Sequence, residues 1–197
     1  MHKAGRILHE EHLAISAVLH ALQHLARMAQ APGVRADFKA FRAMIHYIDA
    51  FPERLHHPKE DQLLFSLLWE KSPEARPLVE KLRAEHIAGA HLVRDLERAV
   101  RDYEASWPSG AAEFGAAVKA YADFHWAHMS CEEQELLPLA ERALSEQDWA
   151  AVEHAFAQNE DPIADLREQD FDKLYTRILS LAPAPIGLGE PWARAAK

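Results

Sequence analysis

Cysteine, glycine and long apolar runs are all scarce in this chain of 197 residues. The single cysteine, Cys131, excludes an internal disulfide and favours a reducing compartment. Only 7 glycines accompany abundant alanine, leucine, glutamate and arginine, and this balance favours helices. No stretch of eighteen apolar residues occurs, and the N-terminus lacks the pattern of an export signal. We therefore expect a soluble, cytoplasmic protein with no membrane partner.

Basic residues are also in short supply. The chain has 22 Lys and Arg against 31 Asp and Glu, for a formal net charge of −9. A nucleic-acid partner is not expected, because such proteins need clustered basic side chains to displace counterions. No nucleophilic triad, phosphate loop or cofactor fingerprint is present. With 49% apolar residues, the chain can bury one continuous core.

Helical periodicity is the dominant pattern in what remains. Pro- and Gly-containing turns divide the chain into helical segments, so the predicted fold class is all-α. Ser145, with Asp148 in the first turn, should cap the fifth helix. Pro52 and Pro58 should bend the second segment. The predicted helices span about residues 6–30, 37–70, 73–106, 111–144, 145–159 and 165–181, followed by an extended tail over 182–197.

Two phrases of the form His-x-x-x-Glu stand out, at His56–Glu60 and His128–Glu132. Residues four apart share a helix face, so each phrase directs an imidazole and a carboxylate to the same point. Such pairs are also common on solvated helix surfaces. Here, however, His128 and Glu132 interrupt a predicted apolar stripe, and His12 and His86 lie in two others. The stripes run Leu8, His12, Ile15, Leu19, Leu22; Phe41, Ile45, Ile48, Leu63, Leu67; Leu82, His86, Gly89, Val93, Leu96, Val100; and Val118, Tyr121, His125, His128, Glu132, Glu135, Leu139.

The distances of these residues from the turns show that they should converge. Short connections make neighbouring helices antiparallel, so depth can be counted from each turn. His12 lies 21 residues before Gly33, and His56 lies 23 residues after it. Around Pro108, His86 lies 22 residues before and His128 lies 20 residues after. We therefore expect six side chains to meet at one level of a four-helix bundle and bind metal: His12, His56, Glu60, His86, His128 and Glu132.

The donor set indicates which metal this would be. Four imidazoles and two carboxylates without a thiolate suit iron, manganese or zinc, and six side chains are too many for one structural zinc. Two metal ions account for six donor side chains more simply than one ion does. Glu60 and Glu132 are then the natural bridges, with His12 and His56 on one ion and His86 and His128 on the other. A non-haem di-iron centre fits best, with zinc or manganese as alternatives.

Four motifs in this order resemble the hemerythrin-like, HHE cation-binding domain. They are Glu-Glu-His-Leu-Ala-Ile at 10–15, His-His-Pro-Lys-Glu-Asp-Gln-Leu-Leu-Phe at 56–65, Glu-His at 85–86 and His-Met-Ser-Cys-Glu-Glu-Gln-Glu-Leu-Leu-Pro at 128–138. The resemblance implies an up-down-up-down four-helix bundle, which we place over residues 1–145. Residues 146–197 are expected to form a C-terminal helical extension and tail packed on it. The resemblance further implies two irons with an oxo or hydroxo bridge, the four histidines as terminal ligands, and a small ligand such as dioxygen.

One position departs from the family's oxygen carriers, which have a fifth histidine four residues after the position of His86. Here that residue is Ala90, so one iron would have an open position or another donor. His125 lies on the inner stripe, His57 adjoins His56, and His91 lies about 140° from the face of His86. Whether any of these three supplies a further ligand is left open.

Three functions are compatible with such a centre. The first is a binding protein that uses dioxygen, nitric oxide or peroxide for sensing, storage or a redox or iron response. The second is an oxidase- or peroxidase-type enzyme, for which the inner-stripe Tyr121 and His125 could supply protons. A metal that only stabilises the fold is the third possibility. A homo-oligomer is possible. The final helices should cover one face of the bundle, since Trp149, Phe156, Phe171, Leu174 and Ile178 need burial.

Overall fold

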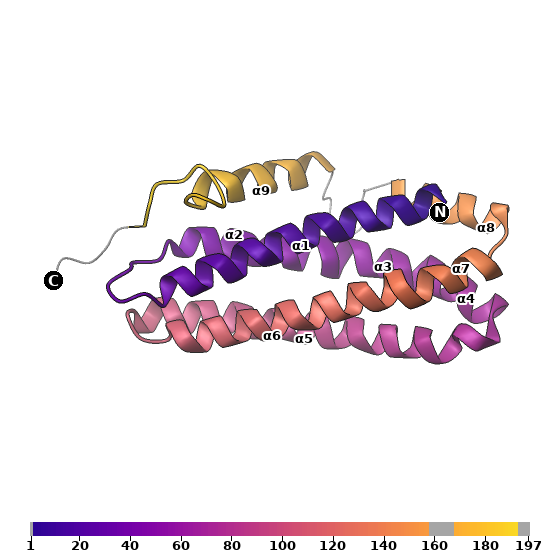
Figure 1. Cartoon of the computed structure of the whole chain (residues 1–197), viewed down its shortest axis with the longest axis horizontal. Helices are drawn as coiled ribbons and strands as arrows, with labels where there is room; N and C mark the ends of the chain where they lie inside the picture. Colours follow the sequence, from indigo (N-terminus) through magenta and orange to yellow (C-terminus); the bar gives the residue numbers. More distant parts are fainter. Residues whose placement is uncertain (1, 158–167, 193–197) are drawn as a thin grey trace.

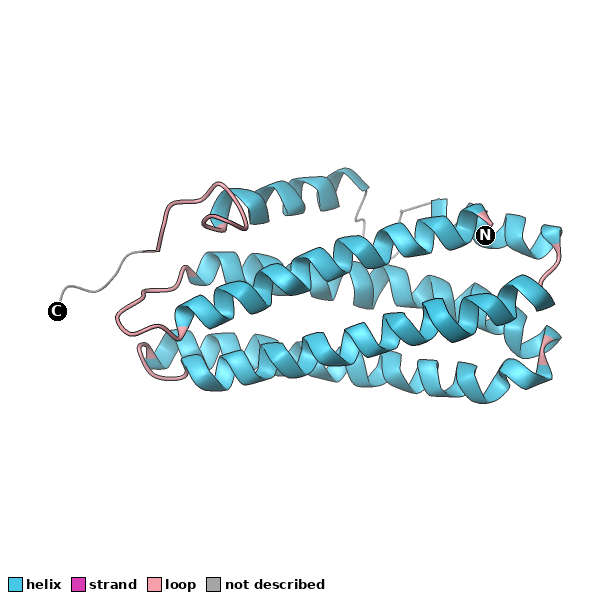
Figure 2. Cartoon of the chain, viewed as in Figure 1, coloured by secondary structure: helices cyan, strands magenta, loops and turns pink. Residues whose placement is uncertain are grey.

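The computed structural model describes residues 2–157 and 168–192, and within these ranges the chain is almost entirely helical (Figure 2). No strand longer than a single bridge residue occurs in this part, and an isolated bridge joins Pro183 and Gly189. The all-α prediction is therefore confirmed. None of the helices in the described ranges is long and apolar enough to cross a membrane.

Four long helical rods lie side by side along the molecule (Figure 1). Helix α5 packs on α6, α6 packs on α1, and α2 packs on α5. The first rod is α1 (Lys3–Ala29) and the third is α5 (Arg76–Ser106), preceded by the short 3₁₀ turn η3 (Pro73–Ala75). The second rod runs through α2 (Phe38–Ile48), η1 (Asp49–His56), α3 (His57–Lys59), η2 (Glu60–Leu64) and α4 (Phe65–Lys71). The fourth comprises α6 (Ala111–Cys131), η4 (Glu132–Leu136) and α7 (Leu137–Ala143).

The second and fourth rods contain π-helical segments, namely η1, η2 and η4. In η2 the amide of Phe65 donates to the carbonyl of Glu60, and in η4 the amide of Leu137 donates to the carbonyl of Glu132. Each of these bonds spans five residues instead of four, so each segment accommodates one extra residue. Pro52, one of the two prolines expected to bend this segment, lies inside η1.

These wide turns correct the predicted apolar stripes downstream of the two glutamates. The buried leucines of the second rod are Leu64 and Leu68, whereas Leu63 and Leu67 are only partly buried. In the fourth rod Leu136 and Ala140 are buried, and Glu135 is exposed. The predictions for Leu63, Leu67, Glu135 and Leu139 were wrong by one residue, because they assumed unbroken α-helical periodicity. The stripes of α1 and α5, which are regular helices, are confirmed.

Two apolar clusters fill the core, one toward each end of the rods. On α1, Leu8 belongs to one cluster and Ile15 to the other; on α5 the same holds for Leu82 and Val93. His12 and His86 lie between these pairs along their helices. The polar residues of the core thus form a layer between two apolar regions.

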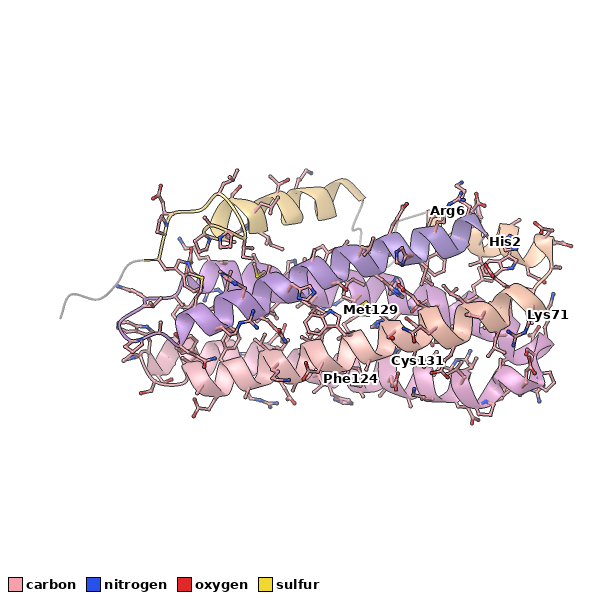
Figure 3. All side chains as sticks on the ribbon, viewed as in Figure 1. His2, Arg6, Lys71, Phe124, Met129 and Cys131 are labelled. Atoms are coloured by element: carbon pink, nitrogen blue, oxygen red, sulfur yellow. The ribbon has the colours of Figure 1, made fainter. Side chains whose placement is uncertain are left out.

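The C-terminal helices pack on the outside of the rods. Helix α8 (Glu146–Ala157) lies against α1, and α9 (Glu168–Leu181) lies against α2. The predicted cap is present, since the Ser145 amide donates to Asp148 Oδ2 over 2.9 Å and the Asp148 amide donates back to Ser145 Oγ over 3.3 Å. At the same end, the ring of His2, labelled in Figure 3, stacks on Trp149 with the ring centroids 4.7 Å apart. Of the residues expected to be covered, Trp149, Phe156 and Ile178 are buried, whereas the side chains of Phe171 and Leu174 lie outside the described residues.

The described part of the tail is not extended as predicted. Residues 183–189 form turns, and the amides of Leu188 and Gly189 donate to the carbonyls of Leu179 and Ala182, both over 2.8 Å. A Cβ atom on Gly187 would lie 2.2 Å from the carbonyl oxygen of Leu179. Glycine therefore allows the tail to fold back onto the end of α9.

Candidate metal centre

The structure brings all six predicted side chains together in the buried polar layer. None of them is more than 6% exposed, and Glu60 and Glu132 are fully buried. The histidines form two pairs: His12 Nε2 lies 3.2 Å from His56 Nε2, and His86 Nε2 lies 3.1 Å from His128 Nε2. These pairs are those expected from the sequence.

The two glutamates lie between the histidine pairs. Glu60 directs Oε1 to His56 Nε2 and Oε2 to His86 Nε2, each over 3.4 Å. Glu132 directs Oε2 to His12 Nε2 over 3.3 Å and Oε1 to His128 Nε2 over 3.2 Å. Each carboxylate therefore faces both pairs, with one oxygen toward each. This is the arrangement that a bridging carboxylate needs.

The unpaired atoms of this layer fit metal ions. All four carboxylate oxygens of Glu60 and Glu132 are buried without a hydrogen-bond partner of good geometry. Orphaned buried acceptors are costly, and a cation is one way to satisfy them. Among the described residues, two groups of donor atoms are close enough to hold an ion, with all atoms in a group within 4.8 Å of one another. One contains His12, His56, Glu60 and Glu132, and the other contains His57, Glu60, His86 and His128.

The carboxylates in and around the layer raise the pKa values of two of its histidines. Burial alone would lower the pKa of His12, but hydrogen bonds to Glu132 and Glu133 raise it to about 10. Burial would also lower the pKa of His86, but hydrogen bonds to Asp61, Glu132 and Glu60 raise it to about 11. Burial would raise the pKa of Glu132, but the charge of His128 and hydrogen bonds from the histidines hold it well below its usual range. Metal ions and protons therefore compete for the same nitrogens.

A ring of outer carboxylates supports the four histidines, and sequence reasoning missed it. Each histidine has Nε2 directed into the layer and Nδ1 directed to a carboxylate of a neighbouring rod. Such partners fix the tautomer and orientation of a metal-binding imidazole. All four lie directly beside a predicted ligand in the sequence, which is the signal that could have revealed them. The pairs are His12–Glu133 at 2.9 Å, His56–Glu11 at 2.6 Å, His86–Asp61 at 3.1 Å and His128–Glu85 at 2.9 Å.

The three further histidines have different surroundings. His91 is exposed on α5, away from the layer. His57 is 4% exposed, and its ring stacks on that of His86 at 4.2 Å. His125 is 1% exposed, and its Nε2 lies 3.2 Å from Glu53 Oε1. Tyr121 Oη donates to the same oxygen of Glu53 over 3.0 Å.

A surface hollow of about 220 Å³ lies next to the layer, between α1 and the fourth rod. Its lining includes His12, Met129 and Glu133. Met129 and Cys131 lie on the α6 stretch that faces the viewer in Figure 3. Cys131 is buried and accepts a hydrogen bond from Lys81 Nζ over 3.2 Å. Burial raises the pKa of the Cys131 thiol.

The comparisons with known proteins agree with this site. Residues 4–140 match the family model of the hemerythrin HHE cation-binding domain. Among curated proteins, no match to the chain is found. The family match spans all four rods, and it includes the six residues of the polar layer. This chain therefore belongs to the hemerythrin HHE cation-binding domain family.

Proposed function

We propose that the chain is a non-haem di-iron protein that binds dioxygen, nitric oxide or peroxide for sensing, storage or a redox or iron response. The observation that carries this proposal is the placement of Glu60 and Glu132, each with one oxygen facing each histidine pair. Two buried carboxylates so placed suit two cations that share them. Zinc and manganese can use the same donors, but zinc has no redox chemistry, and iron at imidazole and carboxylate donors suits the binding of dioxygen and nitric oxide.

In this proposal His12 and His56 bind one iron, His86 and His128 bind the other, and the glutamates bridge both. An oxo or hydroxo group would complete the bridge. In the same proposal, the domain of residues 1–145 is an up-down-up-down four-helix bundle, and the described helices α8 and α9 of the C-terminal extension pack on it. A bound iron pair supplies redox chemistry, and the protein's own groups hold the histidines in one tautomer and keep bulk water from the layer.

The apolar clusters on either side of the layer support binding rather than turnover. A gas-binding pocket keeps its ligand when protons and water are excluded, and 0–6% exposure of the layer meets this condition. Gas binding should then change the visible absorption spectrum reversibly. After anaerobic loading with Fe²⁺, exposure to air should change the visible absorption spectrum, and evacuation should restore it over repeated cycles. Permanent oxidation in the first cycle would contradict a gas-binding role.

An oxidase- or peroxidase-type enzyme is the second candidate, and one observation favours it. Tyr121 donates to Glu53, and Glu53 faces His57 and His125, so proton-carrying groups adjoin the layer. An enzyme needs such groups to deliver protons during the reduction of peroxide. Catalytic consumption of peroxide that is lost in Tyr121→Phe would favour the enzyme. Peroxide consumption no faster than that of free iron would exclude it.

A further inference from the structure

His57 is buried beside the second histidine pair, although its neighbour His56 already belongs to the first. A ring nitrogen of His57 lies within 4.8 Å of donor atoms from Glu60, His86 and His128. We propose that His57 is a third imidazole ligand of the ion held by His86 and His128. It would replace the histidine that the family's oxygen carriers have at the position of Ala90. This inference rests on the proposed di-iron site.

The surroundings of His57 match those of the four predicted ligands. Each of those histidines has Nδ1 opposite a carboxylate, and His57 Nδ1 lies 3.4 Å from Glu53 Oε2. The contact is longer than the others, and the Nδ1 atom is buried without a well-formed hydrogen bond. Metal-bound imidazoles commonly have a carboxylate in this place. Glu53 would therefore orient His57 as Glu11 orients His56.

Helix α5 leaves this position open to the second rod. Gly89 follows His86 by three residues, and a Cβ atom there would lie 3.2 Å from Glu53 Oε1. The same atom would lie 3.5 Å from His125 Nε2. Glu53 therefore occupies the space that a side chain on this face of α5 would need. Ala90, one residue further, offers no donor, so the missing imidazole must come from another rod.

The π-helical segment η1 explains how two consecutive histidines can serve two ions. The amide of His57 donates to the carbonyl of Pro52, five residues earlier. A wider turn places successive side chains at a smaller angle than the roughly 100° of an α-helix. His56 and His57 are accordingly both buried. His125 is different: it faces Glu53, but it belongs to neither group of donor atoms.

The test is a metal titration of metal-free protein with Fe²⁺ under anaerobic conditions, and in parallel with Co²⁺. The wild type should bind two ions. In His57→Ala the second ion should bind at least about 10-fold more weakly, while the first is retained. His91→Ala and His125→Ala are the controls, one exposed and one equally buried, and both should bind two ions as the wild type does. Far-UV circular dichroism of the metal-free variants should match the wild type.

A rescue variant makes the result specific. Adding Ala90→His to His57→Ala removes one imidazole and supplies another on α5, so binding of the second ion should return. If His57→Ala misfolds, His57→Gln keeps a polar group beside Glu53 and should still lose the second ion. Binding of two ions with wild-type affinity in either folded variant would overturn the role of His57 while the di-iron proposal stands. A wild type that binds no pair of ions would overturn the proposed function as well.

Discussion

The first and third rods differ from the second and fourth in one respect that matters for the site. Helices α1 and α5 are regular, and each contributes a single histidine to the polar layer. The second and fourth rods each contribute a histidine and a glutamate, and in both the helix widens at that glutamate. The π-turns η2 and η4 begin at Glu60 and Glu132. In both rods, therefore, the bridging carboxylate stands at the start of a π-turn.

The α-helical geometry of the two rods is interrupted at the residues that we propose as metal ligands. π-turns are rare, and their hydrogen bonds are less favourable than those of an α-helix. Their position at two equivalent glutamates is difficult to attribute to packing, because the flanking leucines remain buried after each of them. We infer that the wide turns serve the orientation of the carboxylates.

The largest effect is expected at the bridging glutamates. Glu60→Ala or Glu132→Ala should lose most of the bound metal, since both ions lose a ligand at once. His12→Ala should retain more metal, because only one ion is affected. Metal content after gel filtration, together with the melting temperature, measures the difference. Metal retention equal to that of the wild type in both glutamate variants would remove these residues from the site.

The shift in the apolar stripe can be tested within the second rod. Leu64→Ala removes a fully buried side chain, so it should destabilise the metal-free protein by about 2–5 kcal/mol. Leu63→Ala, which truncates a partly buried neighbour, should cost less than about 2 kcal/mol. Urea unfolding gives both values. A larger loss for Leu63→Ala would support the unbroken helical stripe instead of the π-turn.

Sequence reasoning succeeded where the helices are regular. The inward residues of α1 and α5 followed from periodicity, and the convergence of the histidines followed from turn positions. The predicted inward residues after Glu60 and Glu132 were wrong. The hydrophobic pattern before each glutamate gives no sign that the helix will accommodate an extra residue there. Sequence reasoning left open whether His57 supplies a further ligand. Only the backbone geometry of η1 places His57 beside His86.

A deletion can test whether η4 holds one extra residue. Gln134 is exposed in the middle of η4, and its removal should convert the π-turn to an α-helix with Leu136 and Ala140 still facing the core. The metal-free variant should therefore fold, with weaker metal binding because Glu132 is reoriented. Removal of Asp123, which is exposed in regular helix α6, is the control and should disrupt the fold. Equal disruption by the two deletions would argue against an extra residue.

A further effect concerns pH. The pKa values of His12 and His86 are raised to about 10 and 11 in the folded, metal-free protein, above the ordinary value of 6.5. Their charged forms therefore stabilise the fold fully below about pH 6.5, and this contribution declines as pH rises toward those raised values. The melting temperature of the metal-free protein should fall between pH 7 and 9. The metal-loaded protein, whose histidines are neutral, should lack this slope, and parallel curves would contradict the assignment.

The central claim is that Glu60 and Glu132 hold two ions between the histidine pairs, and metal content tests it most directly. Protein purified from iron-replete cells should contain about two iron ions per chain, as expected for a carboxylate-bridged pair. Elemental analysis combined with a protein concentration from amino-acid analysis gives the ratio. A ratio near two for iron in the wild type, with most of it absent in Glu132→Ala, is the predicted result. A single zinc ion per chain without iron would contradict the account.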